Sequence, residues 1–503
     1  MLPNLRVIVA TLGTLLLFLA AALLLPMLVG LLYGEAEWWT FGATAIVSGG
    51  LGFAAWRGGG GLSQDLGIRE GFAIVALSWL VLSLFGSLPF VLGGVLESYT
   101  DAFFETMSGF TTTGATILGG SATPNVEAIP NAFLFWRSLT HWLGGMGIIV
   151  LTLAILPILG VGGMQLFKAE VPGPSADKLT PRIRETARRL WLIYVGITAA
   201  EVILLLPAMS LFDGINHAFA TMATGGFSTE NGSVGQYQSP YVEWVITAFM
   251  FLAGTNFALH YRLLARRTGS VFRDTEFRVY VAIIAVATMV VALATWEPMV
   301  AMLPWAGRDA VVFGGYAEPL DALRTAAFQV VAIVTTTGFG TADYEIWPPL
   351  GIGLIFLLFF CGGMAGSTGG GVKIIRHVLM FKNSFREIKQ LIHPSAVIHV
   401  RLNGDVVPRD VLSNVLSFIV LYIGGIGVGT AIMFGVGLDV TSAFGAAMSA
   451  IGNIGPAFGT LGPTENYAHV PGFGKWMLSL LMMAGRLELF TVLILFAPAF
   501  WRR

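Results

Sequence analysis

The sequence Thr111-Thr112-Thr113-Gly114-Ala115 is the first of four related pentapeptides in a chain of 503 residues. The other three are ATGGF at 223–227, TTTGF at 335–339 and GNIGP at 452–456. Aligned on the fourth position, their glycines stand at 114, 226, 338 and 455, with spacings of 112, 112 and 117 residues. A fixed period indicates a repeated architecture. One such peptide alone would be interpreted as a polar turn, but four at this spacing predict four copies of one structural unit.

Each pentapeptide lies between a short apolar stretch and a long one. The short stretches lie near 101–111, 214–223, 321–335 and 440–451. They cannot cross a bilayer, which takes about 20 apolar residues, but such segments are tolerated at membrane depth where they are buried in protein or line a water-filled cavity. Ten segments are long enough to cross, near 5–33, 39–56, 71–96, 131–157, 188–212, 240–264, 277–303, 348–381, 410–436 and 473–500.

This order predicts an all-α integral membrane protein. Four pseudo-repeated membrane-pore-membrane units surround one central pore, and two extra N-terminal transmembrane helices precede them. The expected divisions are 1–66 for the extra pair and 67–165, 166–268, 269–390 and 391–503 for the four pore units.

The composition agrees with a membrane protein. Of all residues 55% are hydrophobic and 11% are charged, whereas soluble domains have roughly 25% charged residues. The single cysteine, Cys361, excludes an internal disulfide and a thiolate zinc site. The apolar run 7–32 is too long for a secretory signal, so it is interpreted as the first membrane anchor.

The charges are consistent with this topology. If the N-terminus is cytoplasmic, ten spans place most of the 28 Lys and Arg residues inside and most of the 29 acidic residues outside. Basic residues favour the cytoplasmic side, so both termini are predicted to be cytoplasmic. The basic runs 178–189 and 373–389 are interpreted as orientation signals, and a docking surface for a cytosolic partner is the alternative.

The pentapeptides have the chemistry that a dehydrated cation requires. Potassium that leaves water needs a shell of oxygens, and backbone carbonyls aimed into a narrow bore provide one. Glycine permits the backbone angles that aim successive carbonyls the same way, and threonine hydroxyls extend the oxygen ladder or anchor the loop. In the second copy Gly226 is favoured over Gly225, because Gly-Phe then matches the third copy. The predicted potassium-binding filter residues are Thr112, Thr113, Gly114, Thr224, Gly225, Gly226, Thr336, Thr337, Gly338, Asn453, Ile454 and Gly455.

An aspartate precedes each of these glycines by 13 to 17 residues: Asp101, Asp213, Asp321 and Asp439. Aspartate is a favoured N-cap, and its charge complements the helix N-terminus. Each short helix is therefore predicted to begin at the outer surface and to direct its partially negative C-terminal end at the pore centre. Ordinary capping is the alternative, and both can hold.

Residues 361–371 read CGGMAGSTGGG, within the second long segment of the third unit. Glycine costs a helix about 1 kcal/mol per residue, so this stretch predicts a loop inside the membrane, beneath the filter. A flexible gate is the functional interpretation, and a packing kink is the alternative. A phosphate-binding loop is disfavoured because the Gly-Lys-Ser/Thr ending is missing. The predicted gate residues are Gly362, Gly363, Gly366, Ser367, Thr368, Gly369, Gly370, Gly371 and Arg486.

Arg486 belongs to a segment that is predicted to be one apolar helix over 478–496. A charge inside the membrane is costly and indicates function. Arg486 is expected to face the cavity, where it repels a passing cation or holds the glycine loop; a structural hydrogen bond to loop carbonyls is the alternative. Glu201 and His141 are interpreted as packing or hydrogen-bonding residues, and a direct role as ion ligands is the alternative.

Together these residues resemble the Trk/Ktr/HKT superfamily of potassium transporters, and most closely the membrane subunit of the bacterial Trk potassium uptake system. The resemblance covers essentially the whole chain. It rests on the four pentapeptides, on SLTHWLGGMG at 138–147, on the glycine-rich stretch at 361–371 and on GRLE at 485–488. The helices in 5–56 also look like the extra N-terminal pair of the Trk branch.

The resemblance implies potassium uptake across the bacterial inner membrane, with K⁺ as the transported ion and no other cofactor. It also implies a homodimer in the lipid bilayer, a cytosolic NAD- or ATP-binding regulatory subunit (TrkA-like) and no nucleic-acid partner. By the same resemblance, residues 361–371 are an intramembrane gate and Arg486 is part of the constriction. Some plant relatives have serine in place of the first filter glycine and favour sodium, so Gly114 favours potassium.

Other functions are less consistent with the sequence. A secondary transporter with inverted repeats would have an odd number of spans per unit. The potassium-binding subunit of a P-type pump complex shares the four-repeat plan, but its filter segments differ. An enzyme is disfavoured because the sequence has no metal-ligand cluster and no nucleophile-base pairing. Passive flux and symport with H⁺ or Na⁺ both stay open.

Overall fold

The computed structural model describes residues 4–60, 67–120, 123–154, 179–265, 268–301 and 314–502. Regular structure in this part of the chain is almost entirely helical, as predicted. Its only sheet is the ladder of β1 (Arg401–Leu402) against β2 (Asp405–Val406). Outside the described residues lie the predicted divisions at 66 and 165, Lys178, and the ends of the predicted segments 131–157 and 277–303.

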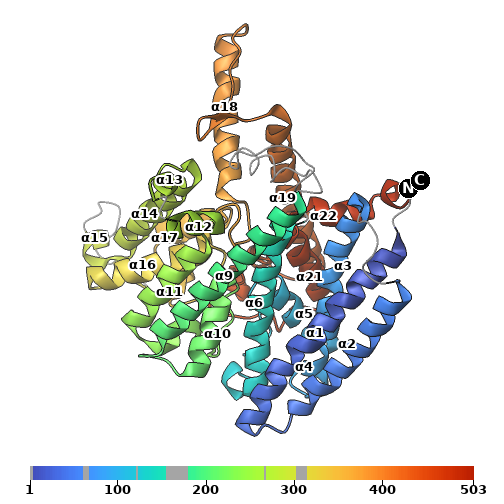
Figure 1. The fold of residues 1–503 in the computed structure, drawn as a ribbon. Helices are drawn as coiled ribbons and strands as arrows, with labels where there is room; N and C mark the ends of the chain where they lie inside the picture. The colour runs from blue at the N-terminus through green and yellow to red at the C-terminus, as the bar shows by residue number, and fades with distance from the viewer. Residues whose placement is uncertain are drawn as a thin grey trace.

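The first two helices, α1 (Leu5–Tyr33) and α2 (Trp38–Gly58), form an antiparallel pair at one side of the molecule (Figure 1). Glycines allow their backbones to approach closely. A Cβ atom on Gly52 would lie 2.8 Å from the carbonyl oxygen of Gly13 and 3.0 Å from the Cβ of Leu16. Small residues at such contacts are typical of packed membrane helices.

This contact predicts a large difference between two neighbouring glycines of α2. Gly52→Leu is expected to destabilise the protein by about 1–3 kcal/mol, because the new side chain overpacks the interface with α1. Gly50→Leu is the matched control, since nothing lies within 4 Å of a Cβ atom at Gly50. Thermal unfolding of the two purified variants in detergent measures the difference, and equal midpoints would contradict this account of the pair.

The remaining helices follow one order four times: a long helix, a short helix, a pentapeptide and a further helical part, which is one long helix in unit 1 and is broken in units 2 to 4. Unit 1 contains α3 (Ile68–Gly86), α4 (Leu88–Leu92), α5 (Tyr99–Phe110) and α6 (Asn131–Ala154). Unit 2 contains α9 (Leu179–Leu205), α10 (Leu211–Met222), α11 (Pro240–Ala253) and α12 (Phe257–Leu264). Unit 3 contains α14 (Thr275–Thr295), α16 (Pro319–Val334), α17 (Pro349–Leu358) and α18 (Ile374–Ile392). Unit 4 contains α19 (Arg409–Gly435), α20 (Val440–Gly452), α21 (Gly472–Arg486) and α22 (Phe490–Leu493).

Shorter elements complete the chain. A 3₁₀ turn follows each pentapeptide: η1 (Val126–Ala128), η3 (Ser233–Tyr237), η4 (Tyr344–Ile346) and η5 (Gly459–Leu461). The other short elements are α13 (Thr268–Phe272), α15 (Glu297–Ala301), η6 (Ile494–Phe496) and α23 (Pro498–Trp501).

The short helices α5, α10, α16 and α20 lead directly into the four pentapeptides. Only Asp439 is an N-cap as predicted: its side chain accepts hydrogen bonds from the amides of Thr441 and Ser442. Asp101, Asp213 and Asp321 instead lie in the first turn of their helices, where a negative charge still complements the helix dipole. The N-cap prediction is therefore wrong for these three, because the cap position falls three residues earlier, at Ser98, Ser210 and Glu318.

Two predicted continuous segments are bent. The axes of α11 and α12 differ by 99°, and those of α21 and the helix after it differ by 116°. The predicted helix over 478–496 is therefore wrong: α21 ends at Arg486, and Glu488 and Leu489 have φ angles of 60° and 51°. Residues in this left-handed region cannot continue a right-handed helix. The break at the glycine-rich stretch is confirmed, since no helix covers residues 361–373.

By length and composition, four described helices can cross a membrane, or six if each bent pair counts as one span. All ten predicted segments contain helix, but ten spans stay a prediction. The N- and C-terminal ends lie side by side (Figure 1), where Phe500 packs with Ile8 and Phe72. Helix α18 projects alone from the body of the molecule (Figure 1).

Candidate functional site

The four pentapeptides share one backbone conformation. Their fourth residues, Gly114, Gly226, Gly338 and Gly455, have φ angles of 81°, 80°, 75° and 102°. The residues two positions earlier are also left-handed: Thr112, Thr224, Thr336 and Asn453 have φ angles of 50°, 55°, 60° and 52°. Such angles favour glycine and are uncommon for other residues. In the second copy, Gly226 and not Gly225 has the shared positive φ.

The pentapeptides also contact one another in a closed ring. The Cα of each fourth-position glycine faces the carbonyl oxygen of the third residue in the next pentapeptide. A Cβ atom built on each glycine would meet that oxygen: Gly114 that of Gly225, Gly226 that of Thr337, Gly338 that of Ile454 and Gly455 that of Thr113. Because the fourth unit returns to the first, the four segments surround one axis.

Threonine side chains attach the pentapeptides to the short helices. The hydroxyl of Thr111 lies 2.6 Å from the carbonyl oxygen of Met107 and 2.8 Å from the hydroxyl of Thr113. Thr335 repeats both contacts in unit 3, with Val331 and Thr337. In unit 4 the first position is Gly452, and Asn453 at the second position donates its amide to the Thr113 hydroxyl and to the Met482 carbonyl. The hydroxyls of Thr111 and Thr335 therefore anchor the backbone.

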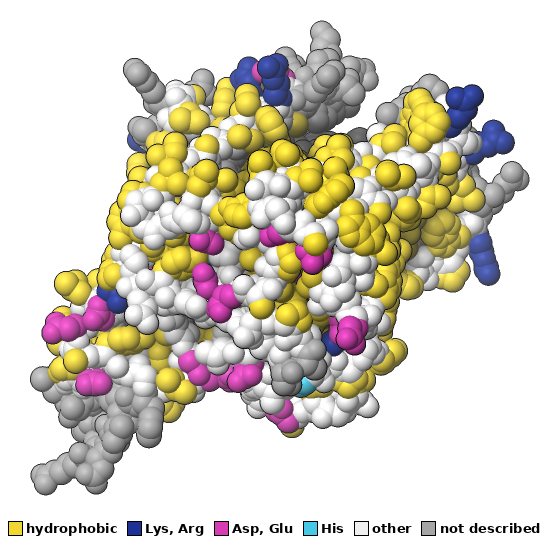
Figure 2. Space-filling model, turned by 90° about the horizontal axis from the view of Figure 1, so that it is seen from below, with side chains coloured by type: hydrophobic (Ala, Val, Ile, Leu, Met, Phe, Trp, Pro, Cys, Tyr) yellow, Lys and Arg dark blue, Asp and Glu magenta, His cyan; other side chains and the backbone are white. Residues whose placement is uncertain are grey.

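The short helices contribute negative charge to this site, and acidic side chains gather on one face of the molecule. The C-terminal ends of four short helices, which have partial negative charge, meet at the pentapeptides. Acidic side chains gather over the middle of the face that is seen from below in Figure 2. In the loop after the second pentapeptide, partial burial and the neighbouring carboxylates of Glu127 and Asp213 raise the pKa of Glu230. This environment favours a cation.

The stretch 361–371, which we call the glycine loop, lies against the third and fourth pentapeptides and against the end of α10, which precedes the second. The amide of Gly370 donates to the hydroxyl of Thr336 at 2.6 Å, and the hydroxyl of Thr368 donates to the carbonyl of Met222 at 2.9 Å. A Cβ atom on Gly370 would lie 2.9 Å from that of Asn453. The predicted position beneath the pentapeptides therefore agrees with the contacts.

Two cationic side chains hold the glycine loop. Arg486 is buried, and its Nη1 donates to the carbonyl of Thr368 at 2.8 Å. The ammonium of Lys373 donates to the carbonyl of Gly369 at 2.5 Å. Glu488 does not pair with Arg486 but forms a salt bridge of 2.6 Å with Arg376 at the base of α18. These contacts agree with the interpretation of Arg486 as a hydrogen-bond donor to a loop carbonyl. They do not conflict with the other interpretation, in which its positive charge repels a cation in the cavity.

The other buried polar residues have different environments. His141 makes two backbone hydrogen bonds, with the carbonyl of Gly109 at 2.9 Å and the amide of Phe227 at 3.3 Å. The carboxylate of Glu201 is fully buried, with no hydrogen-bond partner among the described residues. Among those residues, no group of three or more His, Cys, Asp or Glu side chains is arranged to hold a metal ion.

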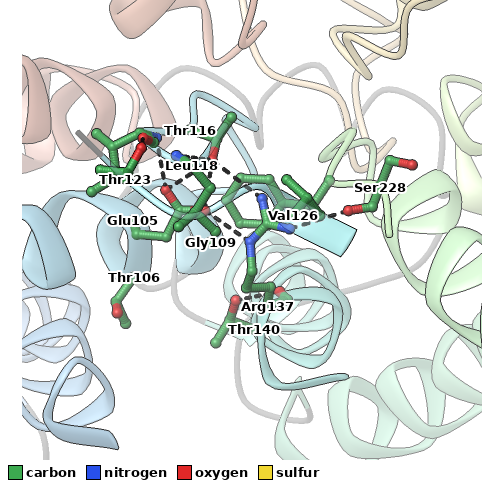
Figure 3. A network of polar contacts seen from close by, with 12 residues as sticks. Glu105, Thr106, Gly109, Thr116, Leu118, Thr123, Val126, Arg137, Thr140 and Ser228 are labelled. Atoms are coloured by element: carbon green, nitrogen blue, oxygen red, sulfur yellow. Dashed lines mark hydrogen bonds and ion pairs between the residues drawn. The ribbon is translucent and has the colours of Figure 1, made fainter. Parts of the chain in front are cut away.

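Arg137 is a buried residue next to the pentapeptides that sequence reasoning missed. The topology predicted from the sequence places Arg137 on the outer face. In the structure its side chain is buried and forms a 2.8 Å salt bridge with buried Glu105 (Figure 3). The available signal was its position one turn before His141 on the same helix, which places both side chains on one face.

The fold and site define a class: helical, multi-pass membrane proteins in which four related backbone segments meet round one axis. A family model described as "TrkH: Cation transport protein" matches residues 39–503. The chain belongs to this TrkH family, which is a family of transport proteins and not of enzymes.

Individual relatives are similar to this chain over nearly its full length. The chain is 41% identical over 501 residues to the Trk system potassium uptake protein TrkH of Salmonella typhimurium, covering 99% of both chains. It is 34% identical over 504 residues to the Trk system potassium uptake protein TrkG of Escherichia coli, again covering 99% of both. The crystal structure of the potassium transporter TrkH from Vibrio parahaemolyticus is similar, with a TM-score of 0.87, 37% identity, and 99% of this chain and 100% of that one covered.

Proposed function

We propose that this chain takes up potassium through a channel-like selectivity filter formed by the four pentapeptides. The observation that carries this proposal is the closed ring of contacts between fourth-position glycines and third-position carbonyls. A ring of backbone carbonyls replaces the hydration shell of K⁺. The pentapeptides contain no charged side chain, so an ion is held by dipoles and can leave again. The relatives' names, which specify potassium uptake, support the choice of ion.

The glycine loop is the gate in this proposal. Its contacts with Thr336, Met222 and Arg486 support a position that obstructs the inner end of the filter. Six glycines give the loop many accessible backbone conformations. The loop opens when these few hydrogen bonds are exchanged for others.

Further parts of the proposal concern the setting of the protein. We place it in the bacterial inner membrane as a homodimer, with both termini cytoplasmic and with a cytosolic NAD- or ATP-binding regulatory subunit (TrkA-like). The projection of α18 (Figure 1) and its basic residues Lys382, Arg386 and Lys389 support a docking role for this helix. Its connection to the glycine loop would transmit the state of that partner.

Ion flux into liposomes tests the proposed function. The purified protein is expected to pass K⁺ and Rb⁺ better than Na⁺ and Li⁺, because filter carbonyls match the larger ions. Uptake is measured for each ion at a fixed membrane potential, with protein-free liposomes as the control. Equal uptake of Na⁺ and K⁺ would contradict the proposal. Repeating the measurement at varied potential and pH separates passive conduction from coupling to H⁺.

A further inference from the structure

A buried ion pair of the first pore unit also contacts the second unit, behind the first two pentapeptides. Glu105 lies on the short helix α5 and Arg137 on α6, and both side chains are almost inaccessible to solvent. We propose that this pair consists of positioning residues that fix the first two pentapeptides relative to each other and so set the preference for K⁺ over Na⁺. The inference rests on the proposed function.

Arg137 uses its whole guanidinium group (Figure 3). Its Nε donates to Glu105, its Nη1 donates to the carbonyl of Ser228 at 3.1 Å, and its Nη2 donates to the hydroxyl of Thr116 at 3.3 Å. Its Cζ lies 4.2 Å from the centre of the Phe227 ring. Thr116 follows the first pentapeptide by one residue, Phe227 ends the second, and Ser228 follows it, so one side chain holds both segments.

Glu105 fixes the other side of this connection. One of its oxygens accepts from Arg137, and the other accepts from the amide of Ile117 at 3.0 Å. The hydroxyl of Thr116 donates to the same carboxylate at 2.9 Å. The carboxylate therefore ties α5 to the backbone that leaves the first pentapeptide.

His141 adds a second connection one helical turn further along α6. It bonds to the carbonyl of Gly109 on α5 and to the amide of Phe227 in the second pentapeptide. Glu105 and Gly109 are four residues apart on α5, as Arg137 and His141 are on α6. The two connections are thus parallel, and they restrict both sliding and rotation of unit 2 against unit 1.

The other three unit boundaries are held differently in the part of the chain that the structure describes. Behind the pentapeptides, Gly235 donates to the carbonyl of Gly340, Tyr344 to that of Ala457, and Tyr467 to that of Thr116. These three hydrogen bonds are neutral, and the charged contacts at the same boundaries are more exposed: Arg324 with Glu243, Lys475 with Asp101, and the amide of Gly459 with Glu345. The boundary between units 1 and 2 differs because both members of its ion pair are almost inaccessible to solvent, and Arg137 bonds to the residues directly after the first and second pentapeptides. Bonds to charged groups are stronger than neutral ones.

Stiffness at this boundary bears on selectivity. The ring includes the contact between Gly114 and the carbonyl of Gly225, which lies within a few residues of the groups that Arg137 holds. Selection of K⁺ over Na⁺ depends on the size of the cavity and on the field of the carbonyl dipoles. A looser boundary would let the carbonyls contract around the smaller ion.

The test compares variants of two arginines that each form an ion pair and each bond to a neighbouring unit. Arg324 on α16 pairs with Glu243 on α11 at 2.8 Å and with Asp321, and within the described residues neither ion pair includes a pentapeptide residue. Arg137→Gln is expected to lower the K⁺ to Na⁺ uptake ratio in liposomes by about tenfold, the effect of losing one charge-assisted hydrogen bond. Arg324→Gln is expected to keep the wild-type ratio, even where it lowers thermal stability.

Two milder variants keep the test decisive should Arg137→Gln fail to assemble. Arg137→Lys retains the charge opposite Glu105 but cannot bond Glu105, Thr116 and Ser228 together, and Glu105→Gln retains the shape of the side chain. Both are expected to lower the ratio while eluting as the wild type does in size-exclusion chromatography. A wild-type ratio in these variants would overturn the inference, because a merely structural role reduces yield or stability and not selectivity. A wild-type protein that itself lacks K⁺ preference would instead refute the proposed function, and the inference with it.

Discussion

Replacing Gly114 with serine is expected to lower the K⁺ to Na⁺ uptake ratio by about tenfold or more, because strain at such a backbone position costs on the order of 1–3 kcal/mol. Two causes act together. The φ angle of Gly114 is 81°, which L-residues other than glycine rarely adopt. The new Cβ atom would also clash with the carbonyl oxygen of Gly225 in the next unit. Measurement of K⁺ and Na⁺ uptake in liposomes gives the ratio directly.

Gly94→Ser separates these two causes. Gly94 follows α4 and has a φ angle of 68°, so serine there has similar backbone strain, but nothing lies within 4 Å of its Cβ position. This variant is expected to keep the wild-type ratio and to be moderately less stable. Unchanged selectivity in Gly114→Ser, or an equal loss of selectivity in both serine variants, would contradict the proposal that the ring of carbonyls selects K⁺.

The local features of the site were predictable because glycine favours positive φ angles and breaks helices. The period of the pentapeptides, the choice of Gly226 and the break at the glycine loop all follow from residue types that sequence displays directly. The closed ring was expected from chemistry, but its order around the axis needed coordinates, since its contacts join residues more than 100 positions apart.

The bends and Arg137 were not predictable, for physical reasons. Hydropathy averages over a window, so a break of only three residues, LEL at 487–489, leaves the profile of one helix. Nothing in a leucine indicates the positive φ of Leu489, which tertiary contacts impose. Arg137 resembled an orientation charge because its partners Glu105 and Ser228 are 32 and 91 residues away.

Arg486→Ala is expected to raise basal K⁺ uptake into liposomes by about tenfold or more, since a hydrogen bond to a charged group contributes roughly 1.5–3 kcal/mol. Arg486 donates to the carbonyl of Thr368 and so holds the glycine loop under the pentapeptides. Its positive charge is buried beside the path that the ion takes in the proposed function. Removing the side chain both frees the loop and removes that repulsion. Uptake without any regulatory partner, normalised to the amount of protein, is the measurement.

Two further variants complete this test: Arg278→Ala is the control, and Arg486→Lys identifies whether charge repulsion or the bond to Thr368 closes the pore. Arg278→Ala removes an exposed positive charge on α14 and is expected to leave basal uptake unchanged. Arg486→Lys keeps the positive charge on a side chain that lacks the guanidinium fork. If repulsion closes the pore, the lysine variant stays closed; if the bond to Thr368 closes it, the lysine variant leaks as alanine does. Wild-type uptake by Arg486→Ala would exclude both, and the glycine loop would then be held shut by its own bonds to Thr336 and Met222.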